Sequence, residues 1–161
     1  MSNSTVKTQG TKLYFVDPLT SSVPAIVELG CPTGITGLGG AADQIETTCL
    51  TETVDRTFAR GLGNPGQVSV PFNLLPSDAS HQLLFELSDS GLVVNWLAAL
   101  SDGTNTPASL DSNDRIVPPN DRTSFGFDGY IADINIDIAT NEIVRGTLTL
   151  QRSGPVTATW N

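Results

Sequence analysis

The residues that could do chemistry are few, and His81 is the only histidine among them. It lies between Ser80 and Gln82, at the expected start of a helix. A polar position of this kind is usually solvated, so we expect His81 to be an exposed surface residue and not a general base. We therefore expect no catalytic residues.

The two cysteines, Cys31 and Cys49, do not form a CxxC pair. A structural zinc site needs about four Cys or His ligands, so we expect no metal site and no cofactor. The first residues contain no basic and then apolar leader, which indicates synthesis in the cytosol with reduced thiols. The longest apolar run, residues 92–94, is far too short to span a membrane, so we expect no membrane partner.

Residues 30–40 are rich in glycine, with five glycines in this stretch. A phosphate-binding loop would need a Gly-Lys-Ser/Thr sequence followed by a helix, and here strand-like residues follow instead. We expect a long, flexible surface loop over residues 30–44.

Asp133 and Asp137 are the remaining pair that could act together. Four residues apart on a strand they would lie about 13 Å from each other, which is too far for a glycosidase carboxylate pair. With Asn135 between them, they are expected to form the polar face of a sheet.

The composition indicates a chain that assembles with copies of itself. Charged residues make up only 16% of the 161 residues, against about 25% in a typical domain. A polar surface with few charges is easier to bury against a partner than one rich in Lys and Glu. The 17 acidic and 8 basic residues give a net charge of −9, which disfavours tight binding to a phosphate backbone.

Short alternating runs separated by 15 glycines and 10 prolines are typical of a mainly β protein. Strands are expected over residues 11–16, 24–29, 45–53, 67–75, 92–100 and 131–138, with a return strand over 144–151 after a turn at Thr140 and Asn141. Within residues 67–75 the side chains alternate between apolar and polar. Pro71 cannot donate a hydrogen bond to a neighbouring strand, so this strand is expected at a sheet edge or at a bulge.

One helix is expected over about residues 78–90. Ser77 or Asp78 would cap its start, and Gly91 would end it. Its apolar face would be formed by Leu83, Leu84, Phe85 and Leu87. Residues 101–124 form a second long, polar loop. Together these elements predict a single domain over residues 1–161. We expect an antiparallel β-sandwich or partial barrel with one flanking helix and an N-terminal arm of residues 1–10.

Four segments in this order resemble the tail tube (major tail) proteins of long-tailed, non-contractile bacteriophages. They are CPTGITGLGGAADQIETTCL at residues 31–50, GLGNPGQVSVPFN at 61–73, the Trp96 strand ending in SDG at 101–103, and the hairpin from FDGY at 127–130 to LQRSG at 150–154. Their order and spacing carry the resemblance, which spans roughly residues 11–154.

The resemblance implies a non-enzymatic structural protein of the virion tail, made in the host cytoplasm. It implies that six copies form a ring and that rings stack into a β-lined tube for DNA passage during ejection. The implied partners are further copies of the chain, a tape measure protein, a tail terminator and tail tip proteins. DNA would only be in transit, since an acidic lumen repels phosphates.

Two sets of residues follow as candidates for this assembly. Asp133, Asn135 and Asp137 are expected to face the lumen, although outer solvent is an equally good environment for them. Ring stacking is expected to involve the glycine-rich loop, at Thr33, Gly34, Ile35, Thr36, Gly37 and Leu38.

Two other functions remain open from the sequence. The chain could be the ring-forming inner-tube protein of a contractile tail or injection system. It could also be a non-enzymatic β-sandwich module that binds a ligand with its loops.

Overall fold

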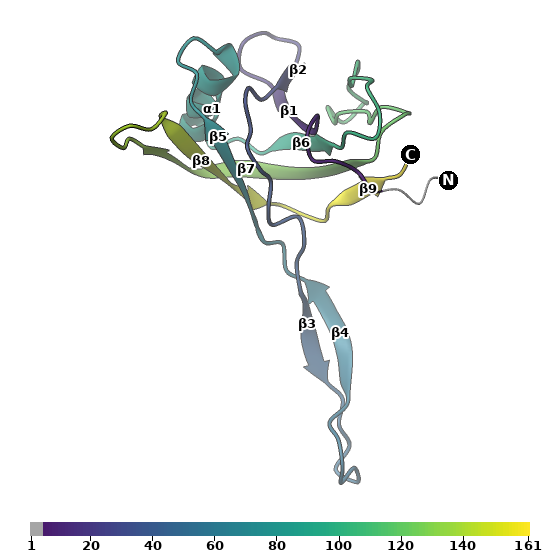
Figure 1. Ribbon diagram of the computed structural model, residues 1–161. Helices are drawn as coiled ribbons and strands as arrows, with labels where there is room; N and C mark the ends of the chain where they lie inside the picture. Colours follow the sequence, from purple (N-terminus) through teal and green to yellow (C-terminus); the bar gives the residue numbers. More distant parts are fainter. Residues whose placement is uncertain (1–4) are drawn as a thin grey trace.

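The computed structural model describes residues 5–161, which form a β-sheet body with one helix and a long hairpin that projects from it (Figure 1). Residues 1–4 of the expected N-terminal arm lie outside the described part. In chain order the elements are β1 Lys12–Asp17, β2 Ala25–Glu28, β3 Ala42–Glu46, β4 Phe58–Gly63, β5 Gln67–Asn73, α1 Ala79–Ser90, β6 Val94–Ala99, β7 Ser124–Asp137, β8 Arg145–Arg152 and β9 Thr157–Thr159.

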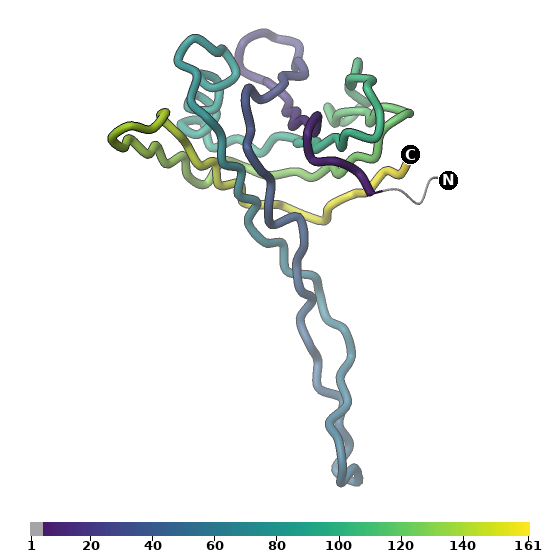
Figure 2. The backbone as a smooth tube through the Cα atoms, viewed as in Figure 1, coloured from purple at the N-terminus to yellow at the C-terminus, as the bar shows by residue number. Residues whose placement is uncertain are grey.

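The body is built on a seven-stranded antiparallel sheet in the order β2-β1-β6-β7-β8-β5, with β9 also paired to β7. The 14-residue β7 runs through the whole body (Figure 2). Its first half pairs with β6 and β9, and its second half pairs with β8. The register shifts between Ile131 and Asp133, and such a bulge bends the strand.

The core lies between the β1–β6 part of the sheet, the β5–β8 part and α1. Trp96 is fully buried, stacks against Phe15 with ring centroids 5.1 Å apart, and donates its indole N–H to the Gly129 carbonyl at 3.1 Å. The mainly β, antiparallel fold class with one flanking helix is confirmed.

The β5–β8 pair shows why the alternating runs fold as they do. Val68 and Val70 face the buried Leu150 and Leu148 across the pair. Phe72 lies opposite Gly146, where a Cβ would come within 2.5 Å of the Phe72 ring, so only glycine fits there. β5 is the last strand in the sheet order, as Pro71 predicted.

Helix α1 begins and ends where the sequence predicts. Asp78 accepts the Ser80 N–H at 2.9 Å as the N-cap, and Gly91 adopts the left-handed conformation at the C-cap with φ 67°. Leu83, Leu84 and Leu87 are buried against the sheet. Phe85, expected on this apolar face, is instead 41% exposed because it lies on the opposite side of the helix.

The expectation that His81 is exposed is wrong. The side chain is 1% exposed, because the helix start packs against Gly30, whose N–H donates to the Ser80 hydroxyl at 3.0 Å. Its Nε2 lies 2.6 Å from the Gly30 carbonyl oxygen, and its Nδ1 accepts the Leu75 N–H at 3.0 Å. His81 therefore joins two chain segments to the helix.

The expected strand over residues 45–53 is also displaced. β3 ends at Glu46, and residues 47–57 form the tip of a hairpin with β4. This hairpin was not predicted, because almost every residue in both strands is exposed and no alternation marks a buried face. The expected loop over 30–44 accordingly ends where β3 begins, at Ala42.

Residues 101–123 form a long loop that is held by buried polar groups. Arg122 is 2% exposed and donates to four backbone carbonyls, those of Gly10, Ala99, Leu100 and Asn105. All three guanidinium nitrogens are thus satisfied without a carboxylate.

Candidate assembly surfaces

The outer face of β7, β8 and β5 is a continuous polar surface. Asp133, Asn135 and Asp137 lie opposite Thr149, Thr147 and Arg145 of β8, respectively. The same β8 residues lie opposite Ser69, Pro71 and Asn73 of β5. We call these nine residues the polar sheet face.

The alternation of the strands fixes which way this face points. Leu148 and Leu150 of β8, and Val68 and Val70 of β5, are fully buried on the other side. Ile134 and Ile136 are partly buried and pack against the same core. The polar side chains of β7 must therefore project away from the body.

The polar sheet face has few charges. Asp133, Asp137 and Arg145 are its charged members, and Arg145 forms no ion pair within 4.0 Å in the described chain. The Asn135 amide donates to Asp137 at 3.2 Å. The remaining members are neutral, so this face lacks the cluster of cations that tight binding to a phosphate backbone needs.

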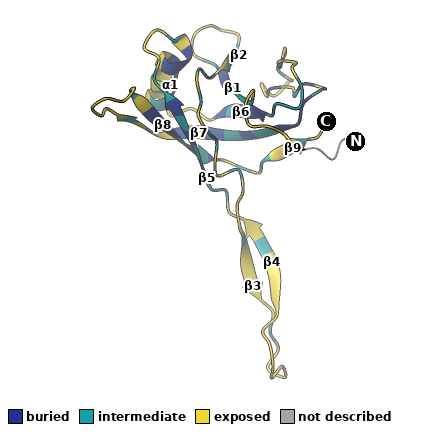
Figure 3. Cartoon of the chain, viewed as in Figure 1, coloured by how far each residue is buried: buried dark blue, intermediate teal, exposed yellow. Residues whose placement is uncertain are grey.

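The β3–β4 hairpin, residues 41–64, is the second exposed feature. It extends from the body as a two-stranded ribbon and is exposed along almost its whole length (Figure 3). Five large apolar side chains are exposed on it: Ile45, Leu50, Val54, Phe58 and Leu62. An isolated hairpin is only marginally stable in water, and exposed apolar residues of this kind indicate a surface that a partner covers.

The candidate stacking residues Thr33–Leu38 lie just before this hairpin. They do not form a free loop, because Thr33 N–H donates to the Pro71 carbonyl at 2.8 Å and Thr36 exchanges two backbone hydrogen bonds with Ser69. Ile35 and Leu38 are partly buried against the core. The segment covers the edge of β5 as an irregular strand, which protects that edge.

The described residues contain no group of three or more His, Cys, Asp or Glu side chains that could hold a metal. Cys31 and Cys49 are free and exposed. Over residues 5–161, no helix has the length and apolar character to cross a membrane.

The carboxyls with shifted pKa values hold the loops and the helix cap, and burial raises the pKa of the Tyr14 hydroxyl. The pKa lies below the ordinary value of aspartate for Asp78, Asp102, Asp111 and Asp121. At Asp102 burial raises the pKa, but hydrogen bonds from the hydroxyl and N–H of Thr123 outweigh it and lower the pKa overall. These four groups serve structure, and none of them lies on the polar sheet face.

Solved structures with a similar fold include a phage tail tube and a prophage baseplate. The chain matches the SPP1 tail tube with a TM-score of 0.66 and 12% identity, covering 98% of this chain and 80% of that one. It matches a chain of the 6-fold symmetrised anti-feeding prophage baseplate with a TM-score of 0.67 and 13% identity, covering 99% and 98%. The fold is therefore shared with a chain of the SPP1 tail tube and a chain of this baseplate.

Sequence comparison identifies the family. The model of the family described as phage tail tube, TTP, lambda-like matches residues 4–161. The chain is also 39% identical over 155 residues to structural protein 3 of Pseudomonas phage PAJU2, covering 94% of this chain and 92% of that protein. The chain belongs to the lambda-like phage tail tube family, and it is a structural subunit of the virion tail.

The resemblance seen in the sequence is thus confirmed, as is the function of a tail tube subunit. The family is one of structural proteins. The sequence analysis did not predict the exposed β3–β4 hairpin. The available signal was the cluster of apolar residues at Ile45, Leu50, Val54, Phe58 and Leu62 between glycine-rich segments, without a strand-like alternation.

Proposed function

We propose that six copies of this chain close into a ring and that rings stack into the tail tube. In this arrangement the polar sheet face lines the bore, and the β3–β4 hairpin reaches the neighbouring ring. The observation that carries the proposal is the joint exposure of these two surfaces on a body whose opposite sheet face packs against the core. Six-fold symmetry is supported by the 6-fold anti-feeding prophage baseplate, which shares the fold.

The bore assignment rests on the side-chain chemistry of the polar sheet face. Asp133, Asn135 and Asp137 project from β7, and together with the threonines of β8 they would give a polar, weakly acidic wall. Joining such sheets between copies would also pair strand edges that otherwise invite aggregation. DNA would pass along this wall without sequence-specific contacts.

The stacking assignment combines the hairpin with the segment at its base. Thr33, Gly34, Ile35, Thr36, Gly37 and Leu38 lie at the body surface beside β5 and remain candidates for stacking contacts. The hairpin has the greater reach and the larger exposed apolar area (Figure 3). The tape measure protein, the tail terminator and the tail tip proteins would meet this tube at its inside and its ends.

The test is assembly of the purified chain with and without the hairpin. A variant in which residues 43–62 are replaced by Asn-Gly should keep the body, since no residue of the hairpin belongs to the core. We expect hollow tubes from the full chain in negative-stain electron microscopy and sedimentation, with tail tip complexes added as an initiator if needed. The variant should stay folded and form no tubes. Tubes of normal yield from the variant would contradict the role of the hairpin.

A further inference from the structure

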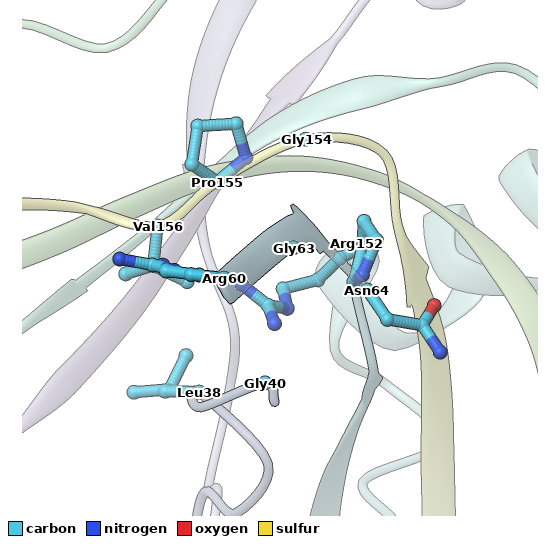
Figure 4. A pocket seen from close by; sticks show the side chains of 10 residues that line it. Leu38, Gly40, Arg60, Gly63, Asn64, Arg152, Gly154, Pro155 and Val156 are labelled. Carbon is cyan, nitrogen blue, oxygen red and sulfur yellow. The ribbon is translucent and has the colours of Figure 1, made fainter. Parts of the chain in front are cut away.

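A cavity of about 500 Å³ lies at the root of the β3–β4 hairpin, where β4 and β8 meet the chain before β9 (Figure 4). Its charged lining residues are Arg60 from β4 and Arg152 from β8. None of the lining residues is acidic. Two cations therefore share a cavity in a chain whose net charge is −9.

Arg152 is buried with an incomplete set of acceptors. The residue is 6% exposed, and its Nη2 donates to the Gly39 carbonyl at 2.6 Å. Its Nε is buried without an acceptor among the described residues. Arg122, the other buried arginine, donates to four carbonyls. Since a buried guanidinium without a full set of partners is unfavourable, Arg152 is suited to receive an anion.

Arg60 is the second cation of the cavity. It is exposed on β4 and forms no ion pair within 4.0 Å in the described chain. Arg56 on the same hairpin differs, because its Nε lies 4.0 Å from Glu46. Arg56 is not part of the cavity lining and provides a matched control for charge.

The direction of Arg152 excludes the bore as the source of the anion. Along β8, Arg152 shares the buried side with Leu148 and Leu150, whereas Thr147 and Thr149 point to the polar sheet face. Transported DNA would meet the polar sheet face and not this cavity. An anion that pairs with Arg152 must therefore come from another molecule that packs against the root of the β3–β4 hairpin.

We propose that this cavity binds a carboxylate side chain of a second copy of the chain when the tube assembles. The inference rests on the proposed function, because it is stacking or ring closure that brings the second copy to the hairpin root. Arginine binds carboxylates through paired hydrogen bonds, and burial strengthens them. The charge balance favours this occupant, since the chain carries 17 acidic residues against 8 basic ones. Arg152 and Arg60 would thereby make assembly depend on a specific contact at the base of each hairpin.

The first test compares Arg60→Glu with Arg56→Glu, which make the same charge change four residues apart. We expect Arg60→Glu to raise the protein concentration needed for half-maximal tube formation about tenfold or more, as for a lost charge-assisted pair. Arg56→Glu should change it by less than about twofold, as for an exposed surface pair. Equal effects of the two substitutions would overturn the proposal.

Arg152→Met separates a role in assembly from a role in folding. We expect the monomer to keep or raise its Tm, because an unpaired buried cation is replaced by an apolar side chain of similar length. Tube formation should fall as with Arg60→Glu. A variant that is folded and assembles like the full wild-type chain would contradict the proposal.

Acetate provides a readout on the monomer that does not depend on tube formation. In NMR titrations of the wild-type chain, the Nε–H signals of Arg152 and Arg60 should shift with saturation, while that of Arg56 should not. Parallel shifts of all three signals would mean an adventitious ion only and would overturn the site. A short DNA duplex that shifts these signals at lower concentration than acetate would also contradict it. If the wild-type chain forms no tubes, the proposed function fails, and the acetate titration still decides whether the carboxylate site exists.

Discussion

Among single residues, His81 does the most to connect separate parts of the chain. Its ring is held between the Leu75 N–H at 3.0 Å and the Gly30 carbonyl at 2.6 Å, and it lies 4.9 Å from the Phe72 ring centroid. Since Nδ1 accepts a hydrogen bond from the Leu75 N–H, Nε2 is the nitrogen that can donate to the Gly30 carbonyl. His81 thus fixes the start of the segment that leads to the β3–β4 hairpin.

Replacing His81 with phenylalanine should destabilise the monomer by about 2–4 kcal/mol, because the Leu75 N–H and the Gly30 carbonyl lose their partners inside the protein. Ring volume and the contact with Phe72 are largely kept. Urea unfolding at neutral pH measures this loss. Glu86→Gln, on the exposed side of the same helix, should change the stability by less than about 0.5 kcal/mol. Similar stabilities for the two variants would show that the hydrogen bonds of His81 are not needed.

Asp102 gives the protein a defined loss of stability in acid. Folding lowers the pKa of this carboxyl, so the unfolded chain takes up the proton first as the pH falls. The Asp102 carboxylate therefore stabilises the folded protein fully above the ordinary aspartate pKa of about 4. This stabilisation disappears as the pH falls through the lower pKa of the folded state.

We expect Asp102→Asn to lower the Tm at neutral pH and to have a smaller effect at about pH 3, because there the carboxyl of the unfolded chain is largely protonated and part of the stabilisation from the lowered pKa of the folded state is lost. Differential scanning calorimetry at both pH values measures the two differences. Asp133→Asn, at an exposed position, serves as the control and should show no such convergence. A Tm difference for Asp102→Asn that is the same at both pH values would contradict the assignment.

At the scale of elements, β5, β7 and β8 divide their residues between a core and a polar surface. Changing Asp133 and Asp137 together to lysine should leave tube assembly intact, since both side chains are exposed and neither forms an ion pair in the described chain. The added cations should bind phosphates and slow DNA passage in a salt-dependent way. Electron microscopy of tubes and DNA ejection from virions carrying the variant measure the two effects.

A double change of Asp133 and Asp137 to asparagine is the matched control, because it removes the charges without adding cations. It should slow ejection less than the lysine variant. Normal ejection from the lysine virions would place these residues outside the bore.

The segment at residues 33–38 and the hairpin should differ in amide exchange. In the monomer the amides of Thr33, Thr36 and Ser69 should be protected by their backbone hydrogen bonds, while those of the hairpin tip exchange fast. In the tube the hairpin should become protected. Hydrogen–deuterium exchange with mass spectrometry compares the two states, and unchanged exchange in the hairpin would argue against its burial between rings.

The elements that the sequence predicted well are those with a buried face. β5 and β8 alternate between apolar and polar residues, and α1 has its cap at Asp78 and its end at Gly91. Each of these signals is local and has a direct physical cause. The sequence therefore predicted β5, β8 and the helix close to their observed bounds, whereas the strand expected from residue 131 begins at Ser124 in β7.

The features that the sequence did not predict depend on contacts between distant segments. His81 is buried by Leu75 and Gly30, and the latter is 51 residues away along the chain. The β3–β4 hairpin lacks a buried face within one subunit, so no alternation marks it. The cavity at the hairpin root joins Arg60 and Arg152, which nothing in their local sequence connects.

At the scale of the whole molecule, the chain is a folded body with a projecting hairpin, β3–β4, whose apolar side chains remain exposed in a single subunit. Members of the lambda-like tail tube family form the tube of the virion tail. We propose that this subunit uses two surfaces in such a tube. One is the polar sheet face opposite the core. The other is the β3–β4 hairpin, which projects from the body and is exposed (Figures 1 and 3). The low proportion of charged residues, 16%, fits a surface that becomes buried on assembly.

The most direct test of this account is a cryo-electron microscopy map of tubes assembled from the purified chain. The account predicts rings of six copies, with Asp133, Asn135 and Asp137 facing the bore and each β3–β4 hairpin buried against a copy in the neighbouring ring. A tube in which the polar sheet face lies on the outer surface, or in which the hairpin remains in solvent, would contradict it.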